Sequence, residues 1–133
     1  MAVISSETLP VASEADVVTV RRCVRESATK LGFSLVDQTK VVTAASELAR
    51  NTLTHGRGGR MELATLNGPR IGIRLVFEDQ GPGIPDIDLA LRDGFTTGSG
   101  LGLGLGGAKR LVNEFEVISR AGQGTKVTVI RWK

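Results

Sequence analysis

Residues 70–85 read RIGIRLVFEDQGPGIP, an apolar run that changes abruptly into acids, glycines and prolines. The first part, from Arg70 to Glu78, is rich in Ile, Leu and Val and predicts a β-strand. Gln80 to Pro85 cannot continue the strand, because its two prolines lack amide donors and its two glycines favour special backbone angles. We therefore expect an apolar strand that ends in a loop, with Asp79 at the junction.

Two hairpins surround this junction. Residues 60–66 are also rich in apolar residues, and Asn67-Gly68-Pro69 is a turn signal between them and the strand at 70–78. Residues 115–120 and 125–132 alternate apolar and polar side chains on either side of AGQG. The pattern predicts one hairpin before the junction and one near the end of the chain.

Two helices are predicted before the first hairpin. The first begins at Ser13, which with Asp16 resembles a capping pair, and ends at Gly32. The second begins at Ser34 and ends at Gly56. Apolar side chains recur at helical spacing in both: Val17, Val20, Val24 and Ala28, then Val41, Ala44, Ala45, Leu48 and Thr52. Residues 2–9 are assigned to neither a helix nor a strand.

The region between the hairpins is glycine-rich. Residues 87–92 suit one or two helical turns, 93–104 predict a glycine-studded loop, and 105–114 have helical periodicity. Helices and hairpins are interspersed, without repeated strand-helix-strand units. We therefore predict an α+β fold, a two-layer sandwich whose mixed, mainly antiparallel sheet carries helices on one face, as a single domain over residues 1–133.

Composition excludes several function classes. The chain has 133 residues, 41% hydrophobic, and its formal charge of +3 is spread out, so no strip suits nucleic acid. The amino terminus does not resemble a signal peptide, and no run of 18 apolar residues occurs, so we expect a cytoplasmic protein without a membrane segment. Cys23 is alone in an apolar helix and is interpreted as a small buried hydrophobe rather than a reactive thiol.

Glu47 and Asn51 lie four residues apart in the second helix, which places them on one face beside the apolar arc. A carboxylate can accept a proton, and an amide oxygen suits Mg²⁺, which shares its coordination shell with water and phosphate oxygens. The alternative is a pair of solvated polar residues at the helix edge.

Asp79 follows a strand and precedes Gly81 and Gly83. An acid at a strand end can accept a hydrogen bond from an exocyclic amine, and glycines let a flat ring approach the backbone. This chemistry suits a nucleobase. The alternative is a sharp turn in which the Asp side chain binds its own backbone.

The run from Gly98 to Gly107 has six glycines in ten residues and leads into a helix that carries Lys109. Backbone amides freed by glycine, together with a helix start, suit a polyphosphate better than a plain flexible loop, which would be entropically costly. The spacing of Gly102, Gly104 and Gly107 fits G-x-G-x-x-G, but the βαβ context of dinucleotide sites is missing, and a Walker loop is absent.

His55 follows the second helix and suits a base, a phosphate contact or, the reading we favour, a cation at a helix end. Because the chain has one histidine and one cysteine, we do not expect a zinc site.

In this order the motifs resemble the GHKL ATPase superfamily, whose ATP-binding domain has the Bergerat fold. Residues 47–51 (ELARN) resemble its N box, 79–83 (DQGPG) its first glycine box, and 95–104 its ATP lid and second glycine box. Gly124-Thr125 resembles the final box, whose Thr lies near adenine. The likeness covers nearly the whole chain.

Within that superfamily, ELARN, EDQGPGIPD, DGFTTGSGLGLGLGGAKRLVNEF and AGQGTKV are similar to the RsbT-type serine kinases of bacterial stress-signalling modules. The resemblance implies an ATP-dependent serine/threonine kinase that acts on a STAS-domain partner in a stressosome, and whose release activates a PP2C-type phosphatase. Related anti-sigma factors share the fold.

The resemblance also implies residue roles. Asp79 accepts from the adenine amino group, Gly81 and Gly83 admit the ring, and Thr125 completes the base pocket. Asn51 holds Mg²⁺, and Glu47 orients the partner's hydroxyl and takes its proton. The γ-phosphate is enclosed by backbone amides of the lid glycines, which are Gly98, Gly100, Gly102 and Gly104. Lys109 assists in this contact.

Two other functions stay open. An anti-sigma factor would sequester a sigma factor and use ATP as a conformational ligand, with the same nucleotide motifs. A degenerate ATP-binding domain without catalysis is disfavoured by the presence of both Glu47 and Asn51. The sequence leaves open whether the chain is a monomer or a homodimer.

Overall fold

The computed structural model describes residues 2–91 and 104–133. Its elements, in chain order, are β1 (Ala2–Val11), α1 (Glu14–Lys30), α2 (Leu35–Thr54), β2 (Gly59–Asn67), β3 (Gly72–Asp79), α3 (Ile87–Ala90), α4 (Gly104–Arg110), β4 (Glu114–Arg120) and β5 (Gly124–Trp132).

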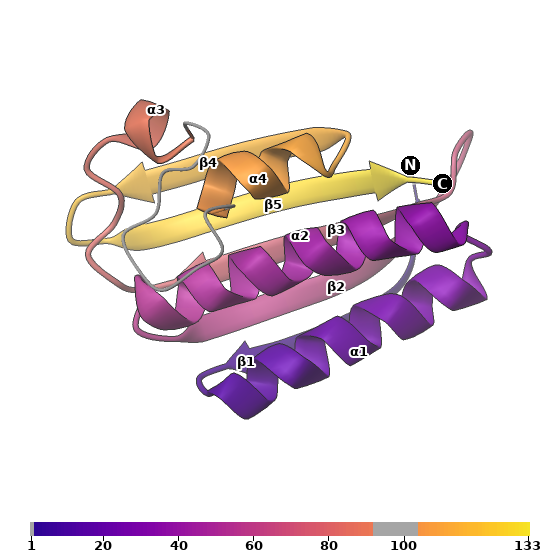
Figure 1. Cartoon of the computed structure of the whole chain (residues 1–133), viewed down its shortest axis with the longest axis horizontal. Helices are drawn as coiled ribbons and strands as arrows, with labels where there is room; N and C mark the ends of the chain where they lie inside the picture. The colour runs from indigo at the N-terminus through magenta and orange to yellow at the C-terminus, as the bar shows by residue number, and fades with distance from the viewer. Residues whose placement is uncertain (1, 92–103) are drawn as a thin grey trace.

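The strands form one five-stranded sheet in the order β1-β2-β3-β5-β4. All four pairings of neighbouring strands are antiparallel, so the described strands contain no parallel pair. Figure 1 shows α1, α2 and α4 lying over one face of this sheet. The predicted α+β sandwich with helices on one face is confirmed.

Both long helices begin where the capping signals predicted. The Ser13 hydroxyl accepts from the Asp16 amide at 3.2 Å, and the Ser34 hydroxyl accepts from the Asp37 amide at 3.1 Å. Each bond satisfies one of the amides that a helix start leaves without an intrahelical partner. Helix α1 is followed by Gly32 at φ 81°, a left-handed conformation that favours glycine.

The core lies between the helices and the sheet. The predicted apolar faces of α1 and α2 are buried, and they meet the helix side of β2 and β3, where Met61, Leu75 and Phe77 are at most 2% exposed. Each such side chain contributes about 1.5–3 kcal/mol of stabilisation on burial. None of the helices within residues 2–91 and 104–133 combines the length and apolar composition needed to cross a membrane.

Strand β1 was not predicted. Its register shifts between Val3 and Ser5, and most of its side chains are exposed. An irregular edge strand has no buried face over most of its length, and so its sequence lacks sustained alternation. The strand forms because it pairs with β2, which lies far along the chain and is not joined to β1 by a hairpin turn.

Helix α4 ends at Arg110, earlier than the predicted Glu114. Glu114 instead begins β4, where it pairs with Ile130 of β5. The Leu111 amide already bonds the Ala108 carbonyl at 3.0 Å, which closes the helix with a tight turn. Strand pairing therefore overrides the local helical periodicity.

Candidate functional site

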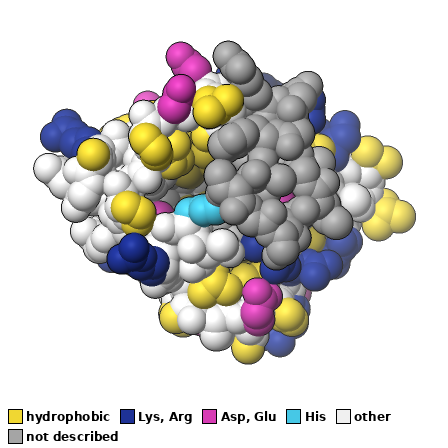
Figure 2. All heavy atoms as spheres, turned by 60° about the vertical axis from the view of Figure 1, so that its left-hand side comes forward, with side chains coloured by type: hydrophobic (Ala, Val, Ile, Leu, Met, Phe, Trp, Pro, Cys, Tyr) yellow, Lys and Arg dark blue, Asp and Glu magenta, His cyan; other side chains and the backbone are white. Residues whose placement is uncertain are grey.

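A cavity of about 210 Å³ opens where α2 ends, next to the adjacent ends of β3 and β5. Its walls are mainly apolar, with polar side chains toward one end and along α2. The apolar residues include Leu48, Phe77, Ile84, Leu89, Leu105 and Val127. Figure 2 shows this side of the molecule, with hydrophobic side chains gathered near the histidine. A cavity below the ~300–1,000 Å³ of a whole-ligand site suits one flat part of a larger ligand.

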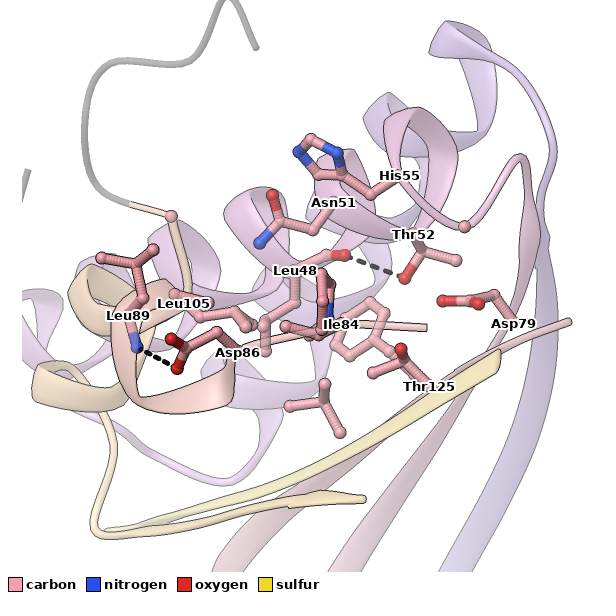
Figure 3. A pocket seen from close by; sticks show the side chains of 16 residues that line it. Leu48, Asn51, Thr52, His55, Asp79, Ile84, Asp86, Leu89, Leu105 and Thr125 are labelled. Carbon is pink, nitrogen blue, oxygen red and sulfur yellow. Dashed lines mark hydrogen bonds between the residues drawn. The ribbon is translucent and has the colours of Figure 1, made fainter. Parts of the chain in front are cut away.

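Asp79 and Thr125 form the polar end of the cavity. They are paired residues in the β3–β5 register, and both line the cavity. Figure 3 shows the two side chains side by side at this end, with the apolar residues extending away from them. The Asp79 Oδ1 atom accepts from the Gly81 amide at 2.9 Å. The side chain therefore makes the self-capping turn that was the alternative prediction, and it also lines the cavity.

Gly81 and Gly83 are each held against protein backbone. A Cβ atom on Gly81 would lie 2.7 Å from the Gly56 Cα atom, and one on Gly83 would meet the Arg120 carbonyl oxygen. Gly83 also has φ of 83°, which favours glycine. These contacts shape the loop, and admission of a flat ring beside the two glycines stays a prediction.

A hydroxyl network behind Thr125 was missed by the sequence analysis. The Ser119 Oγ atom lies 2.9 Å from Thr125 Oγ1 and accepts from the Ile84 amide at 2.7 Å. The Gly122 amide also donates to the Pro82 carbonyl at 2.9 Å, so the glycine loop is tied to the β4–β5 hairpin twice. A signal was present, because Ser119 continues the inward-facing positions of Phe115 and Val117 with a polar residue.

Asn51 and His55 line the cavity from one side of α2, one turn apart (Figure 3). His55 is also the C-cap residue of α2, as the helix-end prediction required. Glu47 lies one turn before Asn51 and is not among the cavity-lining residues. Glu47 is only 8% exposed, so the alternative of a solvated side chain is wrong for this residue.

The remaining predicted residues belong to the glycine-rich run and α4. Gly104 lines the cavity at the start of α4, with φ of 52°. Lys109 is exposed near the end of this seven-residue helix and does not line the cavity. Gly98, Gly100 and Gly102 lie outside the described residues, and their role stays a prediction.

The structure thus brings Asn51, Asp79, Gly104 and Thr125 to one cavity, with Glu47 buried one helical turn away. The carboxyl group of Asp79 and the hydroxyl of Thr125 lie at the polar end, and the amide of Asn51 lies at the side. This arrangement suits a flat ring with an amino edge inside the cavity and a polar extension along α2.

Comparison with known proteins identifies the family to which the chain is similar. The family model described as histidine kinase-, DNA gyrase B- and HSP90-like ATPase matches residues 36–133. The chain is 45% identical to the serine/threonine-protein kinase RsbT of Bacillus subtilis (strain 168), over 90% of this chain and 91% of the relative. It is 29% identical to the anti-sigma F factor of Thermoanaerobacter sp. (strain X514), over 84% of this chain and 82% of that protein.

Solved structures show the same fold. The RsbU and RsbW domains of a Mycobacterium tuberculosis protein superpose with a TM-score of 0.66 at 24% identity, covering 96% of this chain and 32% of that one. The histidine kinase domain of the Erythrobacter litoralis EL346 blue-light activated histidine kinase gives a TM-score of 0.52 at 18% identity, over 92% of this chain and 60% of that one. From the matched family model and the 45% identity, we conclude that the chain belongs to the histidine kinase-, DNA gyrase B- and HSP90-like ATPase family and, within it, to the RsbT-type serine/threonine-protein kinases.

Proposed function

We propose that this chain transfers the γ-phosphoryl group of ATP, with Mg²⁺, to a serine or threonine of a STAS-domain protein. We further propose that it acts in the cytoplasm and that its release from this partner activates a PP2C-type phosphatase. The observation that carries the proposal is the convergence of Asp79, Thr125 and Asn51 on one cavity beside the buried Glu47.

The polar end of the cavity suits the adenine base. An ionised Asp79 can only accept hydrogen bonds, and one of its oxygens is already occupied by the Gly81 amide. The other oxygen is available to accept from the amino group of adenine. The apolar walls, Ile84 and Leu105 among them, would cover the faces of the ring.

The amide of Asn51 suits the metal and phosphate end. It offers one neutral oxygen at the cavity, which fits a Mg²⁺ ion that keeps waters and takes its other ligands from phosphates. When bound, this ion neutralises charge on the phosphates during transfer. Asn51 lines the same cavity as Asp79 and Thr125, which supports a single nucleotide that contacts all three residues.

Glu47 is proposed to orient the hydroxyl of the partner protein and to accept its proton. Its position one helical turn from Asn51 places a carboxylate on the same side of α2 as the metal ligand. A carboxylate is a weak base toward an alcohol until the bond to phosphorus forms, so we expect positioning to contribute more than basicity.

The chain is 45% identical to a serine/threonine-protein kinase and 29% identical to an anti-sigma factor. The higher identity to the kinase supports phosphoryl transfer over sequestration of a sigma factor. The STAS class of partner and the phosphatase target follow from the family resemblance of the motifs.

Transfer of labelled phosphate distinguishes a kinase from a protein that only sequesters a sigma factor. The full chain is incubated with γ-³²P-ATP, Mg²⁺ and each STAS protein encoded near it, and labelled residues are located by mass spectrometry. We expect phosphoserine or phosphothreonine on one STAS protein, and loss of label on chelation of Mg²⁺ or with Glu47→Gln. Stable binding of a sigma factor without any labelled STAS protein would contradict the kinase proposal.

A further inference from the structure

We propose, on the basis of the proposed nucleotide function, that Ser119 is a positioning residue that sets the Thr125 hydroxyl as a hydrogen-bond acceptor. The cavity would then select purines that carry an amino group at the edge facing Asp79 over purines that carry a carbonyl there. Ser119 does not line the cavity, so it would act through Thr125.

The position of Ser119 follows from the sheet register. Asp79 on β3 pairs with Thr125 on β5, and Thr125 pairs with Ser119 on β4. Paired residues point to the same face of a sheet, so three polar side chains lie in a row across three neighbouring strands. Thr125 is in the middle of the row, with the acid on one side and Ser119 on the other.

The contacts of Ser119 determine where the hydroxyl hydrogens lie. A serine hydroxyl has one hydrogen to donate and two lone pairs that accept. The Ile84 amide, 2.7 Å away, can only donate, and the Gly124 carbonyl, 3.3 Å away, can only accept. The Ser119 hydrogen is thus directed to Gly124, and its remaining lone pair accepts from Thr125 at 2.9 Å. This arrangement satisfies every contact at once.

The consequence for Thr125 is a fixed polarity toward the cavity. Because its single hydrogen is donated to Ser119, the Thr125 oxygen presents only lone pairs to a ligand. The Asp79 carboxylate beside it also only accepts. Two neighbouring acceptors complement an amino group, which has two hydrogens. A carbonyl oxygen at the same place would face them unpaired, in a largely apolar cavity that strengthens the penalty.

The test compares ATP with inosine triphosphate, which replaces the amino group by a carbonyl and carries a hydrogen on the neighbouring ring nitrogen N1. Dissociation constants for both nucleotides are measured by calorimetry for the wild-type chain and for Ser119→Ala. In Ser119→Ala, the Thr125 hydroxyl is free to turn and donate to the carbonyl. We expect the preference for ATP to fall about tenfold, with tighter binding of inosine triphosphate.

Further variants separate positioning from structural support. Ser119→Thr keeps the hydroxyl and should restore the wild-type preference. Ser5→Ala is a matched control, because Ser5 Oγ and Thr65 Oγ1 form a similar pair across β1 and β2 at 2.7 Å, away from the cavity. Its preference for ATP should equal that of the wild type. Thr125→Val should reduce the preference for ATP over inosine triphosphate as Ser119→Ala does. The double variant Ser119→Ala/Thr125→Val should show no further reduction.

The outcomes distinguish the two proposals. Equal weakening of both nucleotides in Ser119→Ala would show that Ser119 only holds the loop at Ile84, and would overturn the inference while leaving the proposed function intact. An unchanged preference would also overturn it. A wild-type chain that binds neither nucleotide would overturn the proposed function itself, and the positioning role with it.

Discussion

Gly56, which follows α2, and Asp79, at the end of β3, are in such close contact that a Cβ atom on Gly56 would overlap the Asp79 carboxylate. Gly56 is buried, and the backbone of Gly81 also packs against it. The backbone at the end of α2 therefore restricts where the Asp79 carboxylate can lie at the polar end of the cavity. A residue that the sequence marks only as a helix terminator positions a proposed ligand-binding group.

Gly56→Ala should weaken ATP binding by about tenfold, because the Asp79 side chain must leave its position next to Thr125. Calorimetry measures the affinity, and circular dichroism checks that the variant is folded. A double-mutant cycle with Asp79→Asn is the control: if Gly56 acts through Asp79, the two losses will not add. Additive losses would show that Gly56 acts elsewhere.

Asp79→Asn should weaken ATP binding by about 10- to 100-fold, because the charged acceptor for the amino group is replaced by an amide with its own donors. The amide oxygen can still accept from the Gly81 backbone, so the turn that Asp79 makes should persist. Calorimetry for affinity and thermal unfolding for stability separate the two effects. Undiminished ATP affinity would remove Asp79 from the base pocket.

Glu47→Gln should bind ATP with nearly normal affinity and transfer phosphate about 10²–10⁴-fold more slowly. Glu47 does not line the cavity, and the amide keeps the size of the side chain while removing its proton-accepting charge. Single-turnover labelling of the STAS partner gives the rate, and calorimetry gives the affinity. A variant that transfers phosphate at the wild-type rate would exclude Glu47 from the mechanism.

Asp37→Asn should lower the free energy of unfolding by about 1 kcal/mol at neutral pH. The Asp37 side chain, 29% exposed, pairs with Arg131 at 2.6 Å and links the first turn of α2 to β5. The hydrogen bond from Arg131 holds the pKa of Asp37 below its ordinary value of 3.8. The folded state therefore binds fewer protons, and the stabilisation is present above the ordinary pKa and lost as pH falls through the lower one.

Urea unfolding at neutral pH and at about pH 3 tests this sign, since the difference between wild type and Asp37→Asn should shrink at the lower pH. Glu26→Gln is a suitable control, because its ion pair with Arg22 spans 3.9 Å between side chains that are 59% and 64% exposed. It should have no measurable effect. A difference for Asp37→Asn that grows on acidification would contradict the assigned ion pair.

Cys23 should react slowly with thiol reagents at mildly alkaline pH. It is half-buried against the core, and burial raises the pKa of its thiol, as does the negative charge of Glu7. The thiolate is the reactive form, so less of it is present than in an exposed cysteine. Ellman's reagent measures the rate, with the urea-unfolded chain as reference. Glu7→Gln should accelerate the reaction modestly, and a folded chain that reacts as fast as the unfolded one would refute the raised pKa.

The sequence by itself determined the local parts of this protein. Capping at Ser13 and Ser34, the apolar faces of α1 and α2, and the turns of both hairpins depend on residues a few positions apart. The order of the glycine and acid motifs then indicated the family. These signals are strong because periodicity and turn chemistry act within one element.

Tertiary structure decided the rest. β1 exists because it pairs with β2, and α4 ends early because Glu114 enters a strand pair. The alignment of Asp79 with Thr125 depends on the register between β3 and β5, whose paired residues here are 46 positions apart. The contact of Gly56 with Asp79 depends on where a helix end meets a strand end. Such relationships arise from packing between distant segments, and no local pattern encodes them.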